Sequence, residues 1–209
     1  MLSPRKGRYA SLGEAAAHFW QYEALRHELL ELLPLLKTQI IHLHQPVSSH
    51  YPLPLQIHAT YTREEILAAF SASTTTAPLF LQTGVYYRKP TRTDLLFITL
   101  QKTEKDYSPT TRYLDYAISD QIFHWETQVN TAINSERRQN YLHHKKQNRT
   151  IMLFIRPTKK NNSSRTTPYF CAGPANYVEH QSERPIRITW RLRYPLPGDI
   201  FTKYRAASA

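Results

Sequence analysis

The sequence predicts an α+β protein, in which a helical N-terminal extension precedes a small mixed β-barrel or strongly curved sheet with one or two helices. Seven short segments rich in β-branched and aromatic residues follow one another between residues 83 and 194, separated by turn residues. Only one segment among them has the composition of a helix. The regular alternation of strand and helix that builds parallel sheets is therefore missing.

The N-terminal extension is predicted over residues 1–50. Residues 12–36 contain few β-branched residues, Ser11 can cap the first turn, and Glu14 follows three residues later. Pro34 is expected to disturb the last turn. One apolar stripe follows this helix at spacings of three and four: Phe19, Tyr22, Leu25, Leu29, Leu32 and Leu36. We expect it to pack on the globular body or on a neighbouring domain, and a partner-binding helix is the alternative.

A main domain is predicted from residue 51 to residue 209, after a linker over residues 45–54, which carry three prolines and two serines. Its first element is a short helix within residues 61–70, where Thr62 and Glu65 have capping-box spacing. A second helix is predicted over 135–146. The seven predicted strands are 83–88, 94–101, 112–119, 122–128, 150–156, 168–173 and 186–194.

The charge balance indicates a polyanionic partner. Lys and Arg number 27 against 16 acids, a formal charge of +11, so nucleic acid is the first expectation and an acidic membrane surface the second. No apolar run approaches the ~20 residues of a membrane-spanning helix, and the N-terminus lacks the apolar core of a signal peptide. Cys171 is the single cysteine, which excludes an internal disulfide and favours a reducing, cytoplasmic location.

Motifs for catalysis are mostly missing. With five glycines, the chain contains no GxxxxGK[ST], GxGxxG or GxSxG loop. His143 and His144 are adjacent, and neighbouring side chains on a helix point about 100° apart, so they do not share a metal ion easily. We expect no cofactor, no metal and no intrinsic enzyme activity. One pattern stands against this: Asp115 and Glu126-Thr127-Gln128 resemble the D…ExK layout of magnesium-dependent nucleases, with Gln128 in place of lysine. An acid paired with an arginine is the alternative.

Aromatic and acidic residues alternate in the third and fourth predicted strands. Tyr113 and Asp115 share one side of the first of these, and Phe123 and Trp125 share one side of the next. Aromatic rings that stack on a planar base, with a carboxylate that accepts from a cytosine amine, would form a base pocket. Ordinary core packing is expected for Phe123, and it stays open as the alternative for Tyr113, Asp115 and Trp125.

Basic residues lie among aromatic ones, which favours nucleic acid over a membrane. Lys159 and Lys160 occupy the loop after the fifth predicted strand. Arg187, Arg191 and Arg193 share the parity of one face of the last strand, which predicts a basic face that contacts phosphates. A solvated surface is the alternative.

Six segments, in the same order, resemble a known family over about residues 51–197. They are YTREEILAAF, TDLLFITLQKTEKDYSPTTRYLDYAIS, FHWETQ, LFIRPTKK, GPANYVEH and ITWRLRYPLP. Together they look like the uncharacterised C-terminal domain family of bacterial superfamily II (DEAD/DEAH-type) helicases, some of which carry a phospholipase-D-type nuclease at the N-terminus. This chain contains neither the helicase nor the nuclease part, and it reads WETQ where family members more often read WQSQ.

The resemblance implies a target-recognition module of a modification-dependent (type IV) restriction system. Such a module would flip a modified cytosine, methylated cytosine first, out of double-stranded DNA into a PUA-like or SRA-like curved β-barrel with flanking helices. Helicase and nuclease domains would be its partners, in cis or in trans. Tyr113 and Trp125 would stack on the base and Asp115 would read its amine. The phosphate contacts would come from Arg112, Lys159, Lys160, Arg187 and Arg191. A nuclease centred on Asp115 and Glu126, and a protein-interaction module of a helicase, remain as alternatives.

Overall fold

The computed structural model describes residues 11–38, 45–47, 53–74, 76–101, 115–127, 136–161, 163–181 and 185–205. The chain divides into two compact units. One contains the two N-terminal helices and Ser73–Leu79, and the other contains the sheet. Within the described ranges, no helix combines the length and the apolar composition that crossing a membrane needs.

The N-terminal unit has two helices where the sequence predicted one. Helix α1 (Leu12–Trp20) begins at the predicted cap, where the Ser11 side chain accepts a hydrogen bond of 3.1 Å from the Glu14 N–H. A break of two residues separates it from α2 (Glu23–Thr38). Pro34 lies inside α2, which continues to Thr38. Six large apolar side chains of α2 are exposed: Leu25, Leu30, Leu32, Leu33, Leu35 and Leu36. Packing of the predicted stripe on the main domain stays a prediction.

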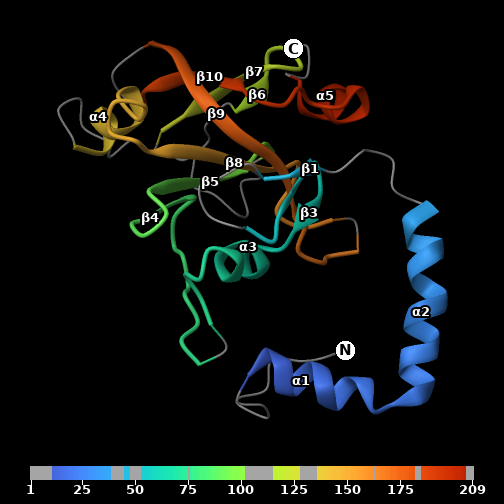
Figure 1. Ribbon diagram of the computed structural model, residues 1–209. Coiled ribbons are helices and arrows are strands. Elements are labelled where there is room, and N and C mark those ends of the chain that lie inside the picture. The colour runs from blue at the N-terminus through green and yellow to red at the C-terminus, as the bar shows by residue number, and fades with distance from the viewer. Residues whose placement is uncertain are drawn as a thin grey trace. The chain divides into compact units, whose positions relative to one another are not determined.

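The main unit is built on one mixed sheet of eight strands (Figure 1). The strand order is β4-β5-β8-β9-β10-β7-β6, and β3 also pairs with β9. Neighbours are antiparallel except β5 and β8, which are parallel. The strands are β3 (Thr60–Tyr61), β4 (Val85–Arg88), β5 (Thr93–Thr99), β6 (Tyr116–Ala117), β7 (Ile122–Glu126), β8 (Thr150–Arg156), β9 (Tyr169–Gln181) and β10 (Arg187–Leu192).

The predicted PUA-like or SRA-like curved barrel is wrong, because the sheet is open. A barrel would need hydrogen bonds between β4 and β6, the two ends of the strand order, and the described residues form no such pair. Burial gives the physical reason. All seven residues of β5 and residues 151–156 of β8 are buried, so these central strands carry a packed layer on each face instead of enclosing one interior.

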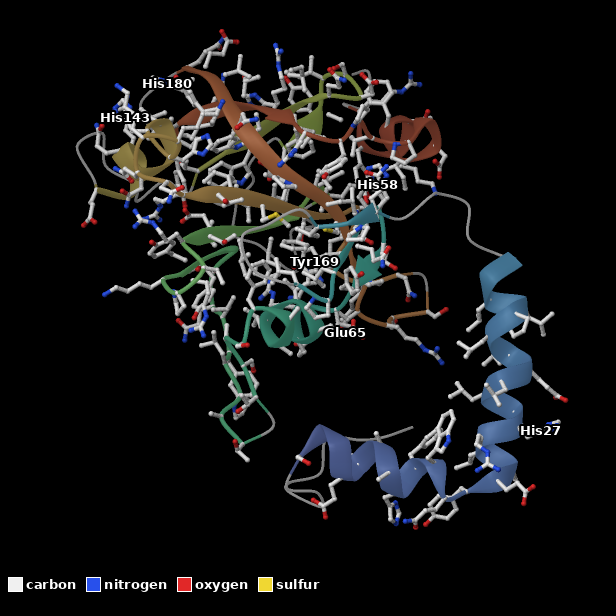
Figure 2. All side chains as sticks on the ribbon, in the orientation of Figure 1. His27, His58, Glu65, His143, Tyr169 and His180 are labelled. Atoms are coloured by element: carbon white, nitrogen blue, oxygen red, sulfur yellow. The ribbon has the colours of Figure 1, made fainter. Side chains whose placement is uncertain are left out.

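Helices cover the two faces of the sheet, as Figure 1 shows. On one face, Tyr141 of α4 (Glu136–Leu142) and Tyr204 of α5 (Gly198–Tyr204) join the main hydrophobic cluster. On the other lies α3 (Arg63–Ala69), which carries Glu65 and lies on the side of Tyr169 (Figure 2). The Arg63 guanidinium is 5.1 Å from the Phe97 ring centroid and donates to the Tyr169 hydroxyl. The predicted capping box of α3 is confirmed.

Strand β9 bends so that it can pair with β3, β8 and β10. Its register shifts twice, once against β8 between Leu153 and Phe154 and once against β10 between Thr189 and Trp190. Such bulges increase the twist of a strand and change its direction. Gly173 lies in the bent part with φ of +86°, and a Cβ there would be 2.7 Å from the Ile57 Cδ1.

Other parts of the chain also differ from the sequence prediction. Part of the predicted linker is structured, because β1 (Gln45–Pro46) pairs with β2 (Gln56–Ile57) and the flanking Val47 and Leu55 are buried. Strand β9 continues eight residues beyond its predicted end at residue 173. Helix α5 was not predicted, although Ile200, Phe201 and Tyr204 follow helical spacing.

Candidate functional site

The structure places Trp125 in the core. Its side chain is 6% exposed, and its ring packs edge-on against Tyr141 at 5.4 Å and at a tilt against Trp190 at 6.4 Å. Stacking on a base requires an accessible ring face. Trp125 presents no such face in this conformation, so packing, the alternative that the sequence left open, describes its position.

Asp115 is also buried, and its carboxylate accepts a hydrogen bond from the main chain. Its Oδ1 accepts a hydrogen bond of 2.9 Å from the Glu126 N–H, which joins the residue before β6 to the end of β7. Tyr113 and Arg112 lie outside the described residues. The structure therefore describes two members of the predicted base-binding trio, Asp115 and Trp125, and both are buried.

The carboxylate of Glu126 is paired with a cation of the protein. Its Oε1 accepts from the Arg187 Nε at 3.0 Å and lies 3.9 Å from the His124 Nε2. Burial lowers the pKa of His124, although the neighbouring Glu126 and Asp115 carboxylates oppose this shift. This is the acid–arginine pair that was the alternative to a nuclease centre. Among the described residues, no group of three or more His, Cys, Asp or Glu side chains is arranged to hold a metal ion.

The outward face of β10 carries both signs of charge. Arg187 and Arg191 are exposed there, as the parity predicted. Their neighbouring strands contribute acids, because Glu126 of β7 is the register partner of Arg187 and Glu179 of β9 is the partner of Thr189. Parity along one strand cannot show what the adjacent strands place beside it. The face is therefore less basic than the sequence of β10 alone predicts.

One basic surface is the loop between β8 and β9. Lys159, Lys160 and Arg165 are exposed, and residues 157–168 contain no acid. The loop is ordered by its own hydrogen bonds, such as the bond of 2.7 Å from the Thr158 hydroxyl to the Lys160 carbonyl.

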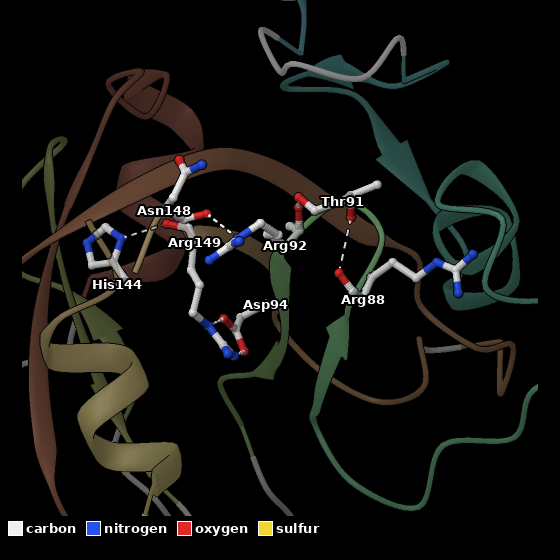
Figure 3. Close-up of polar contacts among 8 residues, drawn as sticks. Arg88, Thr91, Arg92, Asp94, His144, Asn148 and Arg149 are labelled. Atoms are coloured by element: carbon white, nitrogen blue, oxygen red, sulfur yellow. Dashed lines mark hydrogen bonds and ion pairs between the residues drawn. The ribbon is translucent and has the colours of Figure 1, made fainter. Parts of the chain in front are cut away.

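A second basic surface lies at the opposite end of β8, and we name it the basic corner. It combines the turn between β4 and β5 with the turn after α4 (Figure 3). The Arg92 guanidinium donates to the carbonyl oxygens of Gln147 and Asn148, which holds the turns together. Residues 88–92 and 143–149 contain no acid. The exposed cations of the basic corner are Lys89, Arg92, Lys145 and Lys146.

Buried groups beneath the basic corner fix its shape. The Arg149 guanidinium makes two hydrogen bonds, of 2.9 and 2.7 Å, to the Asp94 carboxylate, and it lies 3.6 Å from the Tyr87 ring centroid. The His144 Nε2 accepts from the Tyr177 N–H, so its Nδ1 carries the hydrogen and donates to the Arg149 carbonyl. Burial lowers the pKa of His144, which keeps the ring neutral. Seven residues of β8 separate the corner from the Lys159–Lys160 loop, or roughly 20 Å at the rise of an extended strand.

A family model described as a domain of unknown function (DUF3427) matches residues 55–204. The chain belongs to the DUF3427 family. The DUF3427 match begins at the buried Leu55 before β2 and ends with α5, so it covers both basic surfaces. None of the curated proteins compared with this DUF3427 chain matches its sequence.

The sequence contained a signal for the basic corner, although the predicted phosphate contacts did not include its residues. Both RKPTR (88–92) and HHKKQNR (143–149) are visibly basic. Their adjacency depends on the parallel pairing of β5 and β8, in which Thr93 lies opposite Thr150. This pairing could not be inferred from the order of the strands.

Proposed function

We propose that this DUF3427 chain is a module that binds double-stranded DNA through the phosphate backbone. The observation that carries the proposal is the pair of acid-free basic segments at the two ends of β8, on a chain of formal charge +11. Lysine and arginine that replace the counterions of the DNA supply most of the affinity in such modules. The Lys159–Lys160 loop and the basic corner are the proposed contact surfaces.

The proposed target and setting rest on the resemblance to helicase C-terminal domains. On that basis the module senses a modified cytosine, extruded from the duplex, for a helicase-linked restriction system in the cytoplasm. It performs no catalysis of its own, and helicase and nuclease domains act beside it in cis or in trans. Arg187 and Arg191 then contribute to DNA contact less than the two basic surfaces, since Glu126 pairs with Arg187 and Glu179 lies on the neighbouring strand.

The salt dependence of DNA binding tests this proposal. Replacement of Lys145 and Lys146 by glutamine, and separately of Lys159 and Lys160, should each lower the slope of log affinity against log salt by about 2, since each lost phosphate contact removes close to one unit. The matched control replaces Lys203 and Arg205, two exposed cations at the end of α5. A slope that neither double replacement changes would remove both surfaces from the interface.

A second function, protein binding, is favoured by the exposed leucines of α2. In the setting that the resemblance implies, α2 would bury this surface against the helicase. Replacement of Leu32 and Leu36 by aspartate should then abolish a salt-insensitive association with a helicase domain supplied in trans, measured by light scattering. DNA binding by the same variant should be unchanged, and an unaltered association would exclude α2.

A further inference from the structure

A cavity of about 250 Å³ opens between the β4–β5 hairpin and α4, beside the basic corner. This is smaller than the roughly 300–1,000 Å³ of pockets for drug-sized ligands, so its size suits one small ring system. The side chains that decide its chemistry are Tyr87, Asp94, Glu136, Asn140, Tyr141 and Arg149.

One wall of the cavity is rigid. Tyr87 and Asp94 are register partners on β4 and β5, so their side chains emerge on the same face of the sheet. Arg149 packs on the Tyr87 ring and holds both oxygens of the Asp94 carboxylate. The wall thus presents the Tyr87 ring, which is 37% exposed and packs against Arg149, and an aromatic plane of this kind stacks on flat ligands.

The opposite wall presents a half-buried amide. Asn140 lies on α4, and its side chain makes no hydrogen bond with any residue that the structure describes. An amide offers a donor and an acceptor side by side, which matches the edge of a base that carries an amine next to a ring nitrogen.

The charged residues near the cavity favour one orientation of a ligand that carries an anionic group. Glu136, at the start of α4, lines the cavity, and the exposed Lys145 and Lys146 of the basic corner follow the end of the same helix. An anionic group on the ligand is attracted to the side of the basic corner. A nucleotide has this combination of a flat, amine-bearing ring and a phosphate.

We propose that this cavity receives one nucleobase, whose phosphate lies on the basic corner. The inference rests on the proposed DNA binding and moves base recognition from Tyr113, Asp115 and Trp125 to the space between β4 and α4. The Asn140 amide reads the base edge, and the wall of Tyr87 and Arg149 holds its plane.

The test compares a duplex containing one mismatched cytosine with the same duplex fully paired, since a mismatched base is easier to extrude. The parent chain should prefer the mismatched duplex. Asn140→Leu should reduce this preference roughly tenfold, the scale of one lost base-edge contact, without changing affinity for the paired duplex. The matched control is Asn176→Leu, another half-buried asparagine, on β9 and outside the cavity lining. Melting curves establish that both variants fold.

Titration of the same three proteins with deoxycytidine monophosphate separates the two proposals. If the parent binds no duplex but binds this nucleotide through Asn140, the cavity assignment stands and the DNA-binding proposal fails. The cavity assignment fails, and the DNA-binding proposal stands, if the parent binds DNA without preferring the mismatched duplex. The same conclusion follows if Asn140→Leu keeps the preference, or if Asn140→Leu and Asn176→Leu lose it equally. Binding of neither ligand overturns both.

Discussion

At the scale of residues, the aromatic and acidic side chains around β6 and β7 divide by the face on which they emerge. Trp125 points to the face that α4 and α5 cover, and it packs with Tyr141 and Trp190. His124 and Glu126 point to the other face, where Glu126 pairs with Arg187. Alternation along the strand was predictable. The face of β7 that α4 covers was not predictable, because α4 reaches Trp125 from a separate part of the chain.

The burial of Trp125 predicts a stability effect. Trp125→Ala should lower the free energy of unfolding by about 3–5 kcal/mol, because it leaves a large void in the core. Denaturant titration measures this. The matched control is Trp20→Ala, since the Trp20 side chain is 50% exposed and its loss should change stability little. If Trp125→Ala changes the free energy of unfolding little but abolishes the preference for a modified or mismatched duplex, Trp125 contacts the base after all.

His144 predicts the pH dependence of stability. Its folded pKa is lowered by burial, so the unfolded chain binds a proton more readily, and the stability from the neutral ring is complete above the ordinary pKa of 6.5. Below that value it should be lost progressively as pH falls toward the folded pKa. Melting temperatures between pH 7.5 and 5 should therefore fall less in His144→Gln than in the parent. His143→Gln, at an exposed neighbouring position, should keep the parent profile, and equal profiles for all three proteins would contradict this role.

At the scale of elements, β9 organises the sheet because it is bent by two bulges and has three partner strands. The predicted strand ended at residue 173, where Gly173 and Pro174 read as a terminus. The strand continues because the glycine adopts a positive φ, and the register with β8 runs through Gly173, Pro174 and Ala175. A turn signal within a sequence can therefore be a bend within one strand.

Gly173→Ala should destabilise the protein by about 1–3 kcal/mol, from the strained backbone together with the contact between its Cβ and Ile57. Adding Ile57→Val removes the clashing Cδ1, so the double variant should lose less than the sum of the two single changes. A double-mutant cycle of unfolding free energies measures this coupling. Strict additivity would show that the clash contributes nothing.

At the scale of the whole molecule, the excess of positive charge is unevenly distributed. The outward face of β10 mixes Arg187 and Arg191 with Glu126 and Glu179. Two basic segments that contain no acidic residue lie instead at the ends of β8. A total of +11 predicts attraction to a polyanion, but the position of contact depends on where the cations gather.

We expect no cleavage of DNA by this chain with Mg²⁺ or Mn²⁺. The Glu126 carboxylate is already paired with the Arg187 guanidinium, whereas a nuclease would use it to hold a metal ion. Gln128 also stands where the nuclease pattern has a lysine. Conversion of supercoiled plasmid to the nicked form measures the activity, with Glu126→Gln as the control. Nicking by the parent that this variant lacks would establish a nuclease instead.

The sequence by itself determined the local elements. Its β-branched and aromatic runs located β4 to β10, and Thr62 and Glu65 fixed the start of α3. The polyanionic partner that the count of lysine and arginine indicates stays a prediction. These features depend on side chains within a few positions of one another, so a single segment contains the information.

Only the tertiary structure decided which segments meet. The parallel pairing of β5 and β8 brings Arg92 to the turn that contains Asn148, and α4 closes both the core around Trp125 and the cavity beside Asn140. The open sheet follows from the same cause, since both faces of its central strands are covered by segments distant in sequence. Contacts over fifty or more residues depend on how apolar faces bury one another, and no local pattern encodes that choice.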